Sequence, residues 1–293
     1  MKTNIEIDKG AGPCFGVQRA IGMAEGLLKE REELACLGDL IHNDEEIERL
    51  KKSGLHIISH CQLAEQSKKE LLLRAHGEPP STFRIAANFE IDLVDATCPI
   101  VKQLQKQMNE ASKKMEEQNG QLILFGDLYH AEVMALKGYC RGDLHCVSKV
   151  EDLASLNSKK PTMFFSQTTK YQSDYHEIIN AFRKKRVKEH ASDFSLEVID
   201  SACKQVAKRD LQLVDFLKDK EVLIFVSSRK SSNGNYLFNV GKKKVKAAYF
   251  ISNPSELQKS WFKFYRKIGI SGATSTPLWL LEETNLRLRE MLM

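Results

Sequence analysis

The sequence lacks the long hydrophobic runs of a membrane protein. Apolar stretches such as LILF, LLL and MFF are far shorter than the roughly twenty residues that a membrane span needs. The N-terminal sequence MKTNIEIDKG has no apolar core of the kind found in export signals. We therefore expect no membrane segment and a cytoplasmic location.

The sequence also has no large excess of positive or negative charge, because the net charge is only +5 over 293 residues. The basic runs at 183–186 and 242–244 have no aromatic or glycine-rich recognition pattern beside them, so we expect solvated faces and no nucleic-acid partner. Such runs would equally suit an acidic electron-donor protein. The sequence also has no low-complexity segment and no obvious linker. Its composition, 42% hydrophobic and 28% charged, is typical of a globular chain with a substantial core.

Closely spaced cysteine pairs of the Cys-x-x-Cys type, which mark many metal sites, are missing too. The chain nevertheless has seven cysteines, and an odd number without an export signal indicates thiols rather than a disulfide framework. Three of them stand where an apolar run gives way to a polar turn, in GAGPCFGV, DLVDATCPIV and VIDSACKQVA. These are Cys14, Cys98 and Cys203, which are 84 and 105 residues apart. The spacing predicts one metal ligand from each of three similar segments.

Three interpretations of these cysteines remain open from spacing alone. Three thiolates suit an iron–sulfur cluster that keeps one iron open for substrate. A structural zinc site and a set of inert buried thiols are the alternatives, although zinc sites usually have at least one closely spaced ligand pair. A single nucleophilic cysteine would leave the other two unexplained. Cys36 lies in an apolar stretch and is expected to pack as a small hydrophobe, and no role is assigned to Cys61, Cys140 or Cys146.

Short apolar runs alternate with helical patterns along the whole chain, which predicts an α/β fold with mostly parallel sheets. Ten strand-like runs are ELACLG, LHIIS, ELLLRAHG, IDLVDATC, QLILFGD, PTMFFSQTT, LEVIDSAC, VLIFVSS, AAYFIS and KIGISGATS. The expected helices are 17–31, 44–52, 100–118, 171–185, 204–218 and 277–291. We predict three small α/β domains, 1–97, 98–197 and 198–293.

Nearly every expected strand ends in a polar or glycine-rich turn. Ligands of parallel sheets bind beyond the carboxyl ends of the strands, so these turns are expected to face one cavity. The turns contain no Walker loop and no Gly-x-Gly-x-x-Gly sequence. Their hydroxyl, amide and imidazole groups suit a small, multiply charged anion such as a diphosphate. The residues are His42, His76, His130, Thr168, Ser231, Ser232, Asn233 and Ser275.

Glu132 follows His130 by two residues in one of these turns. In a closed cavity beside an anion, the protonated form of its carboxyl group would be favoured, as a proton donor requires. A glutamate that favours the start of a helix is the other interpretation that the spacing allows. Asp95, three residues before Cys98, is expected to be structural.

Eight motifs in order resemble those of the 4-hydroxy-3-methylbut-2-enyl diphosphate reductase family, the last enzyme of the non-mevalonate isoprenoid pathway. The resemblance extends from about Glu6 to Leu281, nearly the whole chain. The motifs are GPCFGVQRAI, LIHND, RAHG, DATCPIV, HAEV, SQTT, KSSNGN and GATSTP.

The resemblance implies a trefoil of three α/β domains around a central 4Fe-4S cluster. Cys14, Cys98 and Cys203 resemble the three cluster ligands, with one iron open. The implied diphosphate-binding set is His42, His76, His130, Ser231, Ser232, Asn233 and Ser275, with Thr168 near the hydroxyl end of the substrate. The implied catalytic residues are Glu132 as proton source, Thr168 and His130.

The reaction implied by the resemblance removes an allylic hydroxyl group with two electrons and two protons. It gives isopentenyl and dimethylallyl diphosphate plus water. The open iron would bind the substrate hydroxyl as a Lewis acid. The expected partners are the small-molecule substrate and an electron donor such as flavodoxin or ferredoxin, and the expected state is a monomer or weak homodimer.

The chain departs from the family pattern at four places. Pro13 precedes the first ligand where phenylalanine is common, and Val206 stands in a stretch that more usually contains adjacent threonines. Gly234 replaces a third serine after Asn233, and GATS replaces GAS, so that Ser275 is placed by its distance from Pro277.

Two other function classes have to be considered. A redox-neutral 4Fe-4S dehydratase or synthase of the quinolinate synthase type also uses three cysteines, but it would bind carboxylates through arginines. Arg74 is the only arginine near the strand-end turns. An iron–sulfur sensor that binds nucleic acid would need a basic recognition face, against which the small net charge argues.

Overall fold

The computed structural model describes residues 3–293. Its strands are β1 (Asn4–Ile7), β2 (Leu34–Leu37), β3 (Leu55–Ile58), β4 (Glu70–Leu73), β5 (Asp92–Asp95), β6 (Gln121–Phe125), β7 (Leu144–Val147), β8 (Thr162–Ser166), β9 (Leu196–Val198), β10 (Val222–Val226), β11 (Ala247–Ile251) and β12 (Lys267–Gly272). Its α-helices are α1 (Phe15–Glu30), α2 (Asp44–Lys52), α3 (Pro80–Asn88), α4 (Pro99–Glu117), α5 (Ala131–Tyr139), α6 (Gln172–Lys188), α7 (Lys204–Ala207), α8 (Arg209–Phe216), α9 (Ser232–Gly241) and α10 (Leu278–Leu292). Short 3-10 helices are η1 (His60–Gln66), η2 (Val150–Ser155), η3 (Leu217–Asp219), η4 (Pro254–Glu256) and η5 (Lys259–Phe262).

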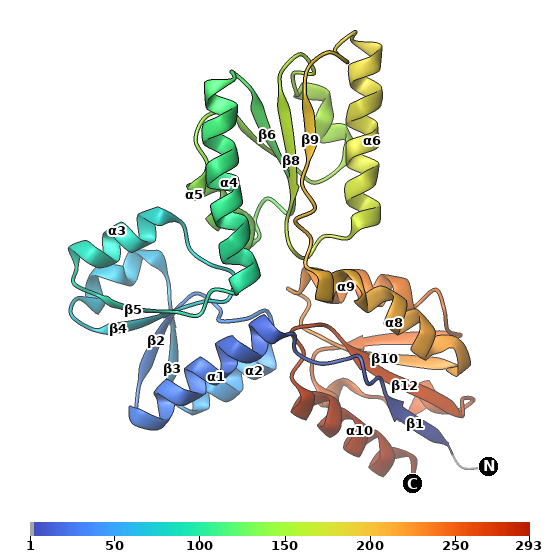
Figure 1. Cartoon of the computed structure of the whole chain (residues 1–293). Coiled ribbons are helices and arrows are strands. Elements are labelled where there is room, and N and C mark those ends of the chain that lie inside the picture. Colours follow the sequence, from blue (N-terminus) through green and yellow to red (C-terminus); the bar gives the residue numbers. More distant parts are fainter. Residues whose placement is uncertain (1–2) are drawn as a thin grey trace. The chain divides into compact units, whose positions relative to one another are not determined.

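The strands form three four-stranded sheets (Figure 1), in the orders β3-β2-β4-β5, β7-β6-β8-β9 and β1-β12-β10-β11. The registered pairings in all three sheets are parallel. The prediction of an α/β fold built on three parallel sheets is therefore confirmed. The predicted domain boundaries after residues 97 and 197 stay a prediction.

The chain divides into two compact units. The first unit comprises the chain up to Leu34, Asp39–Ile57 and Lys204–Met293, and the second comprises Ala35–Gly38 and Ile58–Cys203. β1, which the sequence analysis does not predict, pairs with β12 near the other end of the chain. The first unit thus joins N-terminal and C-terminal segments in one sheet.

The sheet around β6 and β8 is buried on both faces, which explains why its strands are continuous apolar runs. Leu122 and Leu124 pack with α4 and α5, whereas Ile123 and Phe125 pack with α6 and η2. Alternate residues of one strand point to opposite faces, so α4 and α6 lie on opposite sides of this sheet (Figure 1).

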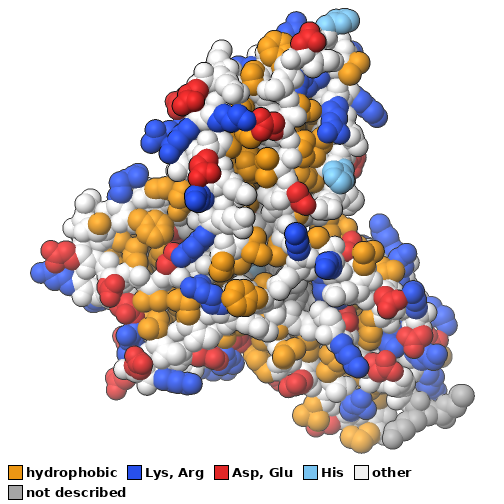
Figure 2. Space-filling model, viewed as in Figure 1, with side chains coloured by type: hydrophobic (Ala, Val, Ile, Leu, Met, Phe, Trp, Pro, Cys, Tyr) orange, Lys and Arg blue, Asp and Glu red, His pale blue; other side chains and the backbone are white. Residues whose placement is uncertain are grey.

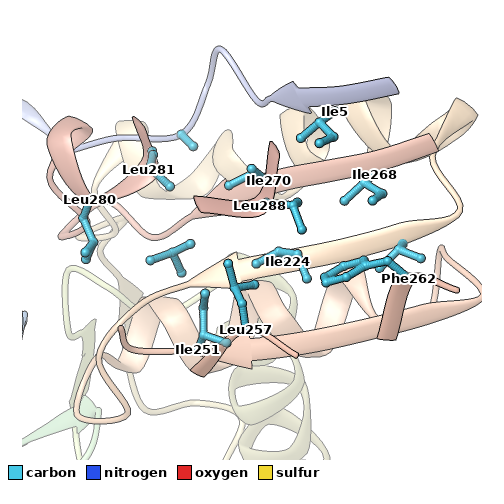
Figure 3. Packing of buried hydrophobic residues seen from close by; sticks show 13 residues of the cluster. Ile5, Ile224, Ile251, Leu257, Phe262, Ile268, Ile270, Leu280, Leu281 and Leu288 are labelled. Carbon is cyan, nitrogen blue, oxygen red and sulfur yellow. The ribbon is translucent and has the colours of Figure 1, made fainter. Parts of the chain in front are cut away.

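The third sheet has a similar core, formed by alternate residues of its strands (Figure 3). Ile224 of β10 and Ile270 of β12 pack with Leu280 and Leu288 of α10 and with Phe262 of η5. In the second unit, β2, β4 and α3 share a smaller cluster. These cores hold the carboxyl ends of the strands in place. The predicted site residues lie in the turns that come after these ends.

The side chains on the surface are mixed in sign. Figure 2 shows Lys and Arg side chains interspersed with Asp and Glu side chains over the visible face. This mixture agrees with the small net charge of +5. No helix within residues 3–293 is both long enough and apolar enough to cross a lipid bilayer.

Candidate active site

The three predicted cluster ligands lie at or beside the start of a helix. Cys14 is the N-cap residue of α1, Cys98 is the N-cap residue of α4, and Cys203 directly precedes α7. Cys14 belongs to the first unit, and the other two belong to the second. The described residues contain no disulfide, as the sequence analysis expects.

The backbone of each of these cysteines is fixed to a strand-end turn that is distant in sequence. The backbone N–H of Cys14 donates to the carbonyl oxygen of Thr274, which follows β12, over 2.9 Å. The N–H of Cys98 donates to Ala75 after β4, also over 2.9 Å. The N–H of Cys203 donates to Thr168 after β8, again over 2.9 Å.

Cys203 donates its backbone N–H to the carbonyl oxygen of Thr168, which follows β8. The segment before Cys203 is held as well, because Ser201 Oγ donates to the carbonyl oxygen of Ser166 over 2.8 Å. All three cysteines are therefore anchored in the same way, through their backbones, and the anchoring does not use their thiol groups.

In the second unit, the Cys98 thiol lies within electrostatic range of two other acidic groups. Burial raises its pKa, and the Cys203 thiol and the Glu132 carboxylate raise it further, whereas backbone N–H groups at the start of α4 lower it. A metal cation among these groups would relieve the repulsion and displace the thiol protons. The second unit therefore offers a donor set that fits a thiolate-bound metal group.

Glu132 is the most strongly perturbed carboxyl group of this site. Its side chain is only 2% exposed. Its Oε1 accepts a hydrogen bond from the backbone N–H of Thr168, and its Oε2 accepts one from Thr168 Oγ1, each over 2.7 Å. No salt bridge among residues 3–293 involves Glu132, so no cation offsets its burial. Burial raises its pKa from 4.5 to about 7, although the bonds from Thr168 lower it.

His130 is the N-cap residue of α5. Its Nδ1 accepts a hydrogen bond from the backbone N–H of Glu132 over 3.1 Å, so the ring of a neutral His130 has its proton on Nε2. The ring of His76 meets it edge to face, with the centroids 5.4 Å apart. The structure thus brings His76, His130, Glu132 and Thr168 together in the second unit.

The turn that contains His76 requires a glycine. Gly77 has a φ of +80°, and a Cβ atom there would lie 2.4 Å from Gln105 Nε2. Arg74 and Glu78 flank the turn, and Arg74 Nε lies 2.7 Å from Glu78 Oε1. Arg74 is therefore already paired with a carboxylate, which argues against its use for a carboxylate substrate.

Four other predicted residues, Ser231, Ser232, Asn233 and Ser275, lie in the first unit, after β10 and β12. Ser231 is the N-cap residue of α9 and accepts from the backbone N–H of Gly234 over 3.0 Å. Ser275 Oγ donates to Ser231 Oγ over 3.3 Å. Asn233 Oδ1 accepts from the backbone N–H and the Oγ1 of Thr274, over 3.0 and 3.1 Å. Ser232 is the first residue of α9.

The packing around Gly234 explains why this position has no serine, the residue that the family pattern leads us to expect there. A Cβ atom at this position would lie 2.2 Å from Ser227 Oγ and 3.0 Å from Ser227 Cβ. The packing of Ser227 against α9 leaves no space for a side chain. The remaining donors of this turn are therefore Ser231, Ser232 and Asn233.

The segment with His42 is connected to the same turns within the first unit. Asp44, the first residue of α2, accepts from Ser228 Oγ over 2.8 Å and lies 2.8 Å from Lys230 Nζ. Lys230 also lies 3.3 Å from Asp39. Burial raises the pKa of Asp44, but the bonds from Lys230 and Ser228 and the charges of Lys230 and His42 hold it below its ordinary value.

Sequence reasoning missed some of these partners. Thr274 connects Cys14 to Asn233, and Lys230 connects the turn after β10 to α2. Their positions inside the motifs GATSTP and KSSNGN were the only available signal. Cys36, expected to pack as a small hydrophobe, is fully buried.

Parallel α/β sheets with thiols, a buried glutamic acid and imidazoles beside their strand ends define a class: α/β enzymes whose active site lies at the carboxyl ends of the strands. Comparison with known proteins makes this specific. The family model described as LytB protein matches residues 5–289. The chain belongs to this family, whose enzymes are iron–sulfur proteins.

Curated relatives agree with the family model. The chain is 42% identical over 282 residues to the 4-hydroxy-3-methylbut-2-enyl diphosphate reductase of Phocaeicola vulgatus, covering 96% of each chain. It is 39% identical over 287 residues to the enzyme of the same name from Parabacteroides distasonis, covering 98% of each. The predicted resemblance is confirmed, and these relatives give no support to the quinolinate synthase type.

Solved structures give the same result. The E-1-hydroxy-2-methyl-but-2-enyl-4-diphosphate reductase from Plasmodium falciparum superimposes with a TM-score of 0.84 at 25% identity, over 97% of this chain and 87% of that one. A second structure, of (E)-4-hydroxy-3-methyl-but-2-enyl diphosphate reductase, gives a TM-score of 0.71 at 28% identity, over 98% and 99% of the two chains.

Proposed function

We propose that this chain uses its own cysteines, Glu132 and strand-end turns to reduce 4-hydroxy-3-methylbut-2-enyl diphosphate. The chain is an oxidoreductase of the terminal step of the non-mevalonate pathway. In the overall reaction the allylic C–O bond breaks, two electrons enter, and one proton joins the leaving oxygen while the other joins the allyl carbon skeleton. The products are water and isopentenyl or dimethylallyl diphosphate.

Cys14, Cys98 and Cys203 would hold a 4Fe-4S cluster with one open iron, around which the three α/β units would be arranged as a trefoil. The Cys98 thiol lies close enough to the Cys203 thiol and the Glu132 carboxylate to interact with both electrostatically, and this proximity supports the ligand set. When bound, such a cluster supplies electrons and a Lewis-acidic iron. The uniform backbone anchoring of the three cysteines supports equal roles for them.

Glu132 is the proposed proton source. Its burial and its pKa of about 7 keep a large fraction of the carboxyl groups protonated near neutral pH. Thr168 holds both carboxyl oxygens and therefore fixes their direction. His130 accepts from the Glu132 backbone N–H through Nδ1, so a neutral ring has its proton on Nε2. The single observation on which the proposal depends most is this buried carboxyl group without a counter-cation, in the unit that contains two of the thiols.

The diphosphate would be bound by neutral donors and imidazoles. Ser231, Asn233 and Ser275 are held by one another and by Thr274 at the N-terminus of α9, where backbone N–H groups favour an anion. Ser232 and the three histidines His42, His76 and His130 complete the proposed set. Fixing a remote diphosphate group allows its binding energy to orient the reacting carbon and to exclude water.

The ligand assignment is tested by counting iron and sulfide after anaerobic purification. Cys203→Ser is expected to lose the cluster and the turnover of the allylic diphosphate with dithionite-reduced methyl viologen. Cys61→Ser is the matched control, because this thiol is exposed and bonded only to Ser59 among the described contacts. Unchanged iron content in Cys203→Ser would reject Cys203 as a ligand.

An electron donor such as flavodoxin or ferredoxin, a cytoplasmic location and a monomeric or weakly dimeric state belong to the same proposal. Dye-driven turnover tests the activity without any protein donor. A wild-type protein that binds a full cluster but does not reduce the allylic diphosphate under these conditions would overturn the proposed function.

A further inference from the structure

An open pocket of about 440 Å³ lies beside the first predicted ligand, entirely within the first unit. It is bounded by the turn before α1 and by α7 and α8. Its lining includes Cys14 and Phe15 and the cationic residues Lys204, Lys208 and Arg209. No aspartate or glutamate is among the lining residues. The pocket therefore has a positive character next to a proposed cluster ligand.

The pocket borders the segments of two proposed ligands. Phe15 follows Cys14 directly, and Lys204 follows Cys203 directly. The two segments are joined, because the backbone N–H of Phe15 donates to Gln205 Oε1 over 3.3 Å. An electron that arrives at this surface would therefore meet residues that are the sequence neighbours of two of the three proposed cluster ligands.

The two lysines of the pocket are available for a partner. Both are exposed, and no salt bridge among residues 3–293 engages either of them. Lys218 and Lys246 of the first unit are paired, since Lys218 lies 2.6 Å from Asp215 and Lys246 lies 2.8 Å from Glu221. Uncompensated charge at Lys204 and Lys208 would attract an acidic surface.

Arg209 has a different role in this pocket. It is only 2% exposed, and its Nη2 donates to Asp8 and, over 2.7 Å, to Ser271 Oγ. This buried network fixes the start of α8 against β12. Lys208, the residue directly before α8, is therefore held in a defined position.

Exposed apolar side chains accompany the charges. Phe15 is 58% exposed and Leu211, on α8, is 72% exposed. A phenylalanine that remains in solvent beside a pocket is typical of the apolar centre of an interface, with basic residues as its rim. The combination fits a protein with an acidic rim and an accessible redox centre.

We propose that this pocket is the docking surface for an acidic, low-potential electron-transfer protein of the flavodoxin or ferredoxin kind. The proposal rests on the proposed function, because that reaction consumes two electrons per substrate. Two successive one-electron oxidations of the donor supply them, while the substrate C–O bond breaks and two protons are taken up. The electrons enter on the side of Cys14 and Lys204.

The test compares two charge-reversed variants of the cluster-loaded protein. Lys204→Glu combined with Lys208→Glu alters the pocket. Lys243→Glu combined with Lys244→Glu is the matched control, since these lysines are also exposed, lie in the same unit and undergo the same change of charge. An acidic flavodoxin is the probe, and its binding is measured by titration calorimetry at low and high salt.

The pocket variant is expected to bind flavodoxin at least tenfold more weakly at 50 mM salt, a difference that shrinks at 500 mM salt because screening removes the steering charge. The control is expected to change less than threefold. Flavodoxin-driven kcat/KM should fall in parallel with binding, while turnover with methyl viologen and iron content stay within twofold of the wild type.

Equal effects of the two variants, or no effect of either, overturn the proposal. Failure of wild-type turnover with methyl viologen would instead contradict the proposed function and leave the binding measurement intact. If charge reversal lowers the iron content, Lys204→Gln with Lys208→Gln replaces it. That neutral variant must weaken flavodoxin binding at least threefold with full iron content, or the proposal is wrong.

Discussion

Replacing Glu132 with glutamine should abolish turnover and, unusually for a buried residue, stabilise the protein at high pH. The Glu132 carboxyl group is buried with hydrogen bonds only from Thr168, and no cation among the described residues compensates its charge. Ionisation in this position is unfavourable. Glutamine keeps the shape; its oxygen can still accept from the Thr168 N–H and its NH2 group can donate to Thr168 Oγ1, but it does not ionise.

The size of the effect follows from the pKa of Glu132, which is about 7 instead of 4.5. Each pKa unit corresponds to about 1.4 kcal/mol, so the difference amounts to about 3 kcal/mol. The folded protein keeps its proton while the unfolded chain loses it between pH 4.5 and 7. The contribution of Glu132 to the free energy of unfolding is therefore largest at low pH and falls by this amount as the pH rises through 7.

The assay is urea unfolding of the cluster-free, thiol-reduced protein at pH 5 and pH 8. Between these two values the free energy of unfolding of Glu132→Gln should gain about 2.5 kcal/mol relative to the wild type, because the unfolded chain has already lost most of this proton at pH 5. In the cluster-loaded protein, dye-driven turnover of the variant should fall by a factor of about 100 or more. Wild-type turnover should decline above pH 7 as Glu132 loses its proton.

Glu78→Gln is the matched control, because Glu78 is the other fully buried glutamate of the second unit. Its carboxylate lies 2.7 Å from Arg74 and 2.7 Å from His60. Glutamine there would leave the Arg74 charge without its partner and cost about 3 kcal/mol at both pH values. If Glu132→Gln shows the same loss as Glu78→Gln, or if the variant retains near-normal turnover, the reasoning on Glu132 is refuted.

Three further substitutions test the first unit. Gly234→Ser should raise the KM for the diphosphate substrate several-fold, since Ser227 occupies the space that the new side chain needs; an unchanged KM would show that α9 adjusts without effect. Asn43→Ala should lower the free energy of unfolding by about 1 kcal/mol through loss of the α2 N-cap bond to Glu46, and a change below the error of urea titration would contradict this. Asp8→Asn should destabilise the protein by about 3 kcal/mol, because the buried Arg209 charge loses its partner; a neutral effect in thermal unfolding would show that Ser271 and solvent suffice.

The long amphipathic elements were predictable from the sequence. α2 begins and ends as expected at Asp44 and Lys52, because acidic residues start it, basic residues end it and Asn43 caps it. α4 and α10 begin one residue away from the predicted positions. The predicted strand runs correspond to ten of the strands because parallel strands buried on both faces are continuous apolar runs.

The errors have identifiable physical causes. The extent of α9 was not predicted, since Ser232-Asn-Gly-Asn has poor helix propensity and packing against β10 decides its state. α3 and α5, of nine residues each, lack the three acidic residues at the start and the three basic residues at the end that mark the equally short α2. β1 (NIEI) and β7 (LHCV) are only four residues long, and polar residues interrupt their apolar pattern. The predicted helix 204–218 is divided into α7 and α8 around Lys208, a break that periodicity does not mark.

The candidate site was predictable as a set of residues but not as a set of contacts. The motif order identified Glu132 and Thr168, whereas the two 2.7 Å bonds between them depend on how β6 and β8 pair. The link between Lys230 and Asp44 likewise joins segments 186 residues apart, which no local pattern encodes. Burial without a counter-cation, the feature that sets the pKa of Glu132, appears only in three dimensions.

The backbone bonds of the cysteines have a consequence for attempts to change the substrate range. Thr274 and Ala75, which accept from Cys14 and Cys98, directly precede Ser275 and His76, and Thr168 accepts from Cys203 while it holds Glu132. A redesigned loop that widens the proposed substrate site for a bulkier allylic compound would shift the same peptide units that hold the metal-binding cysteines in place. Libraries of variants aimed at new substrates should therefore be screened first for retained brown colour. An inactive variant will often have lost its inorganic cofactor and not its ability to bind the substrate.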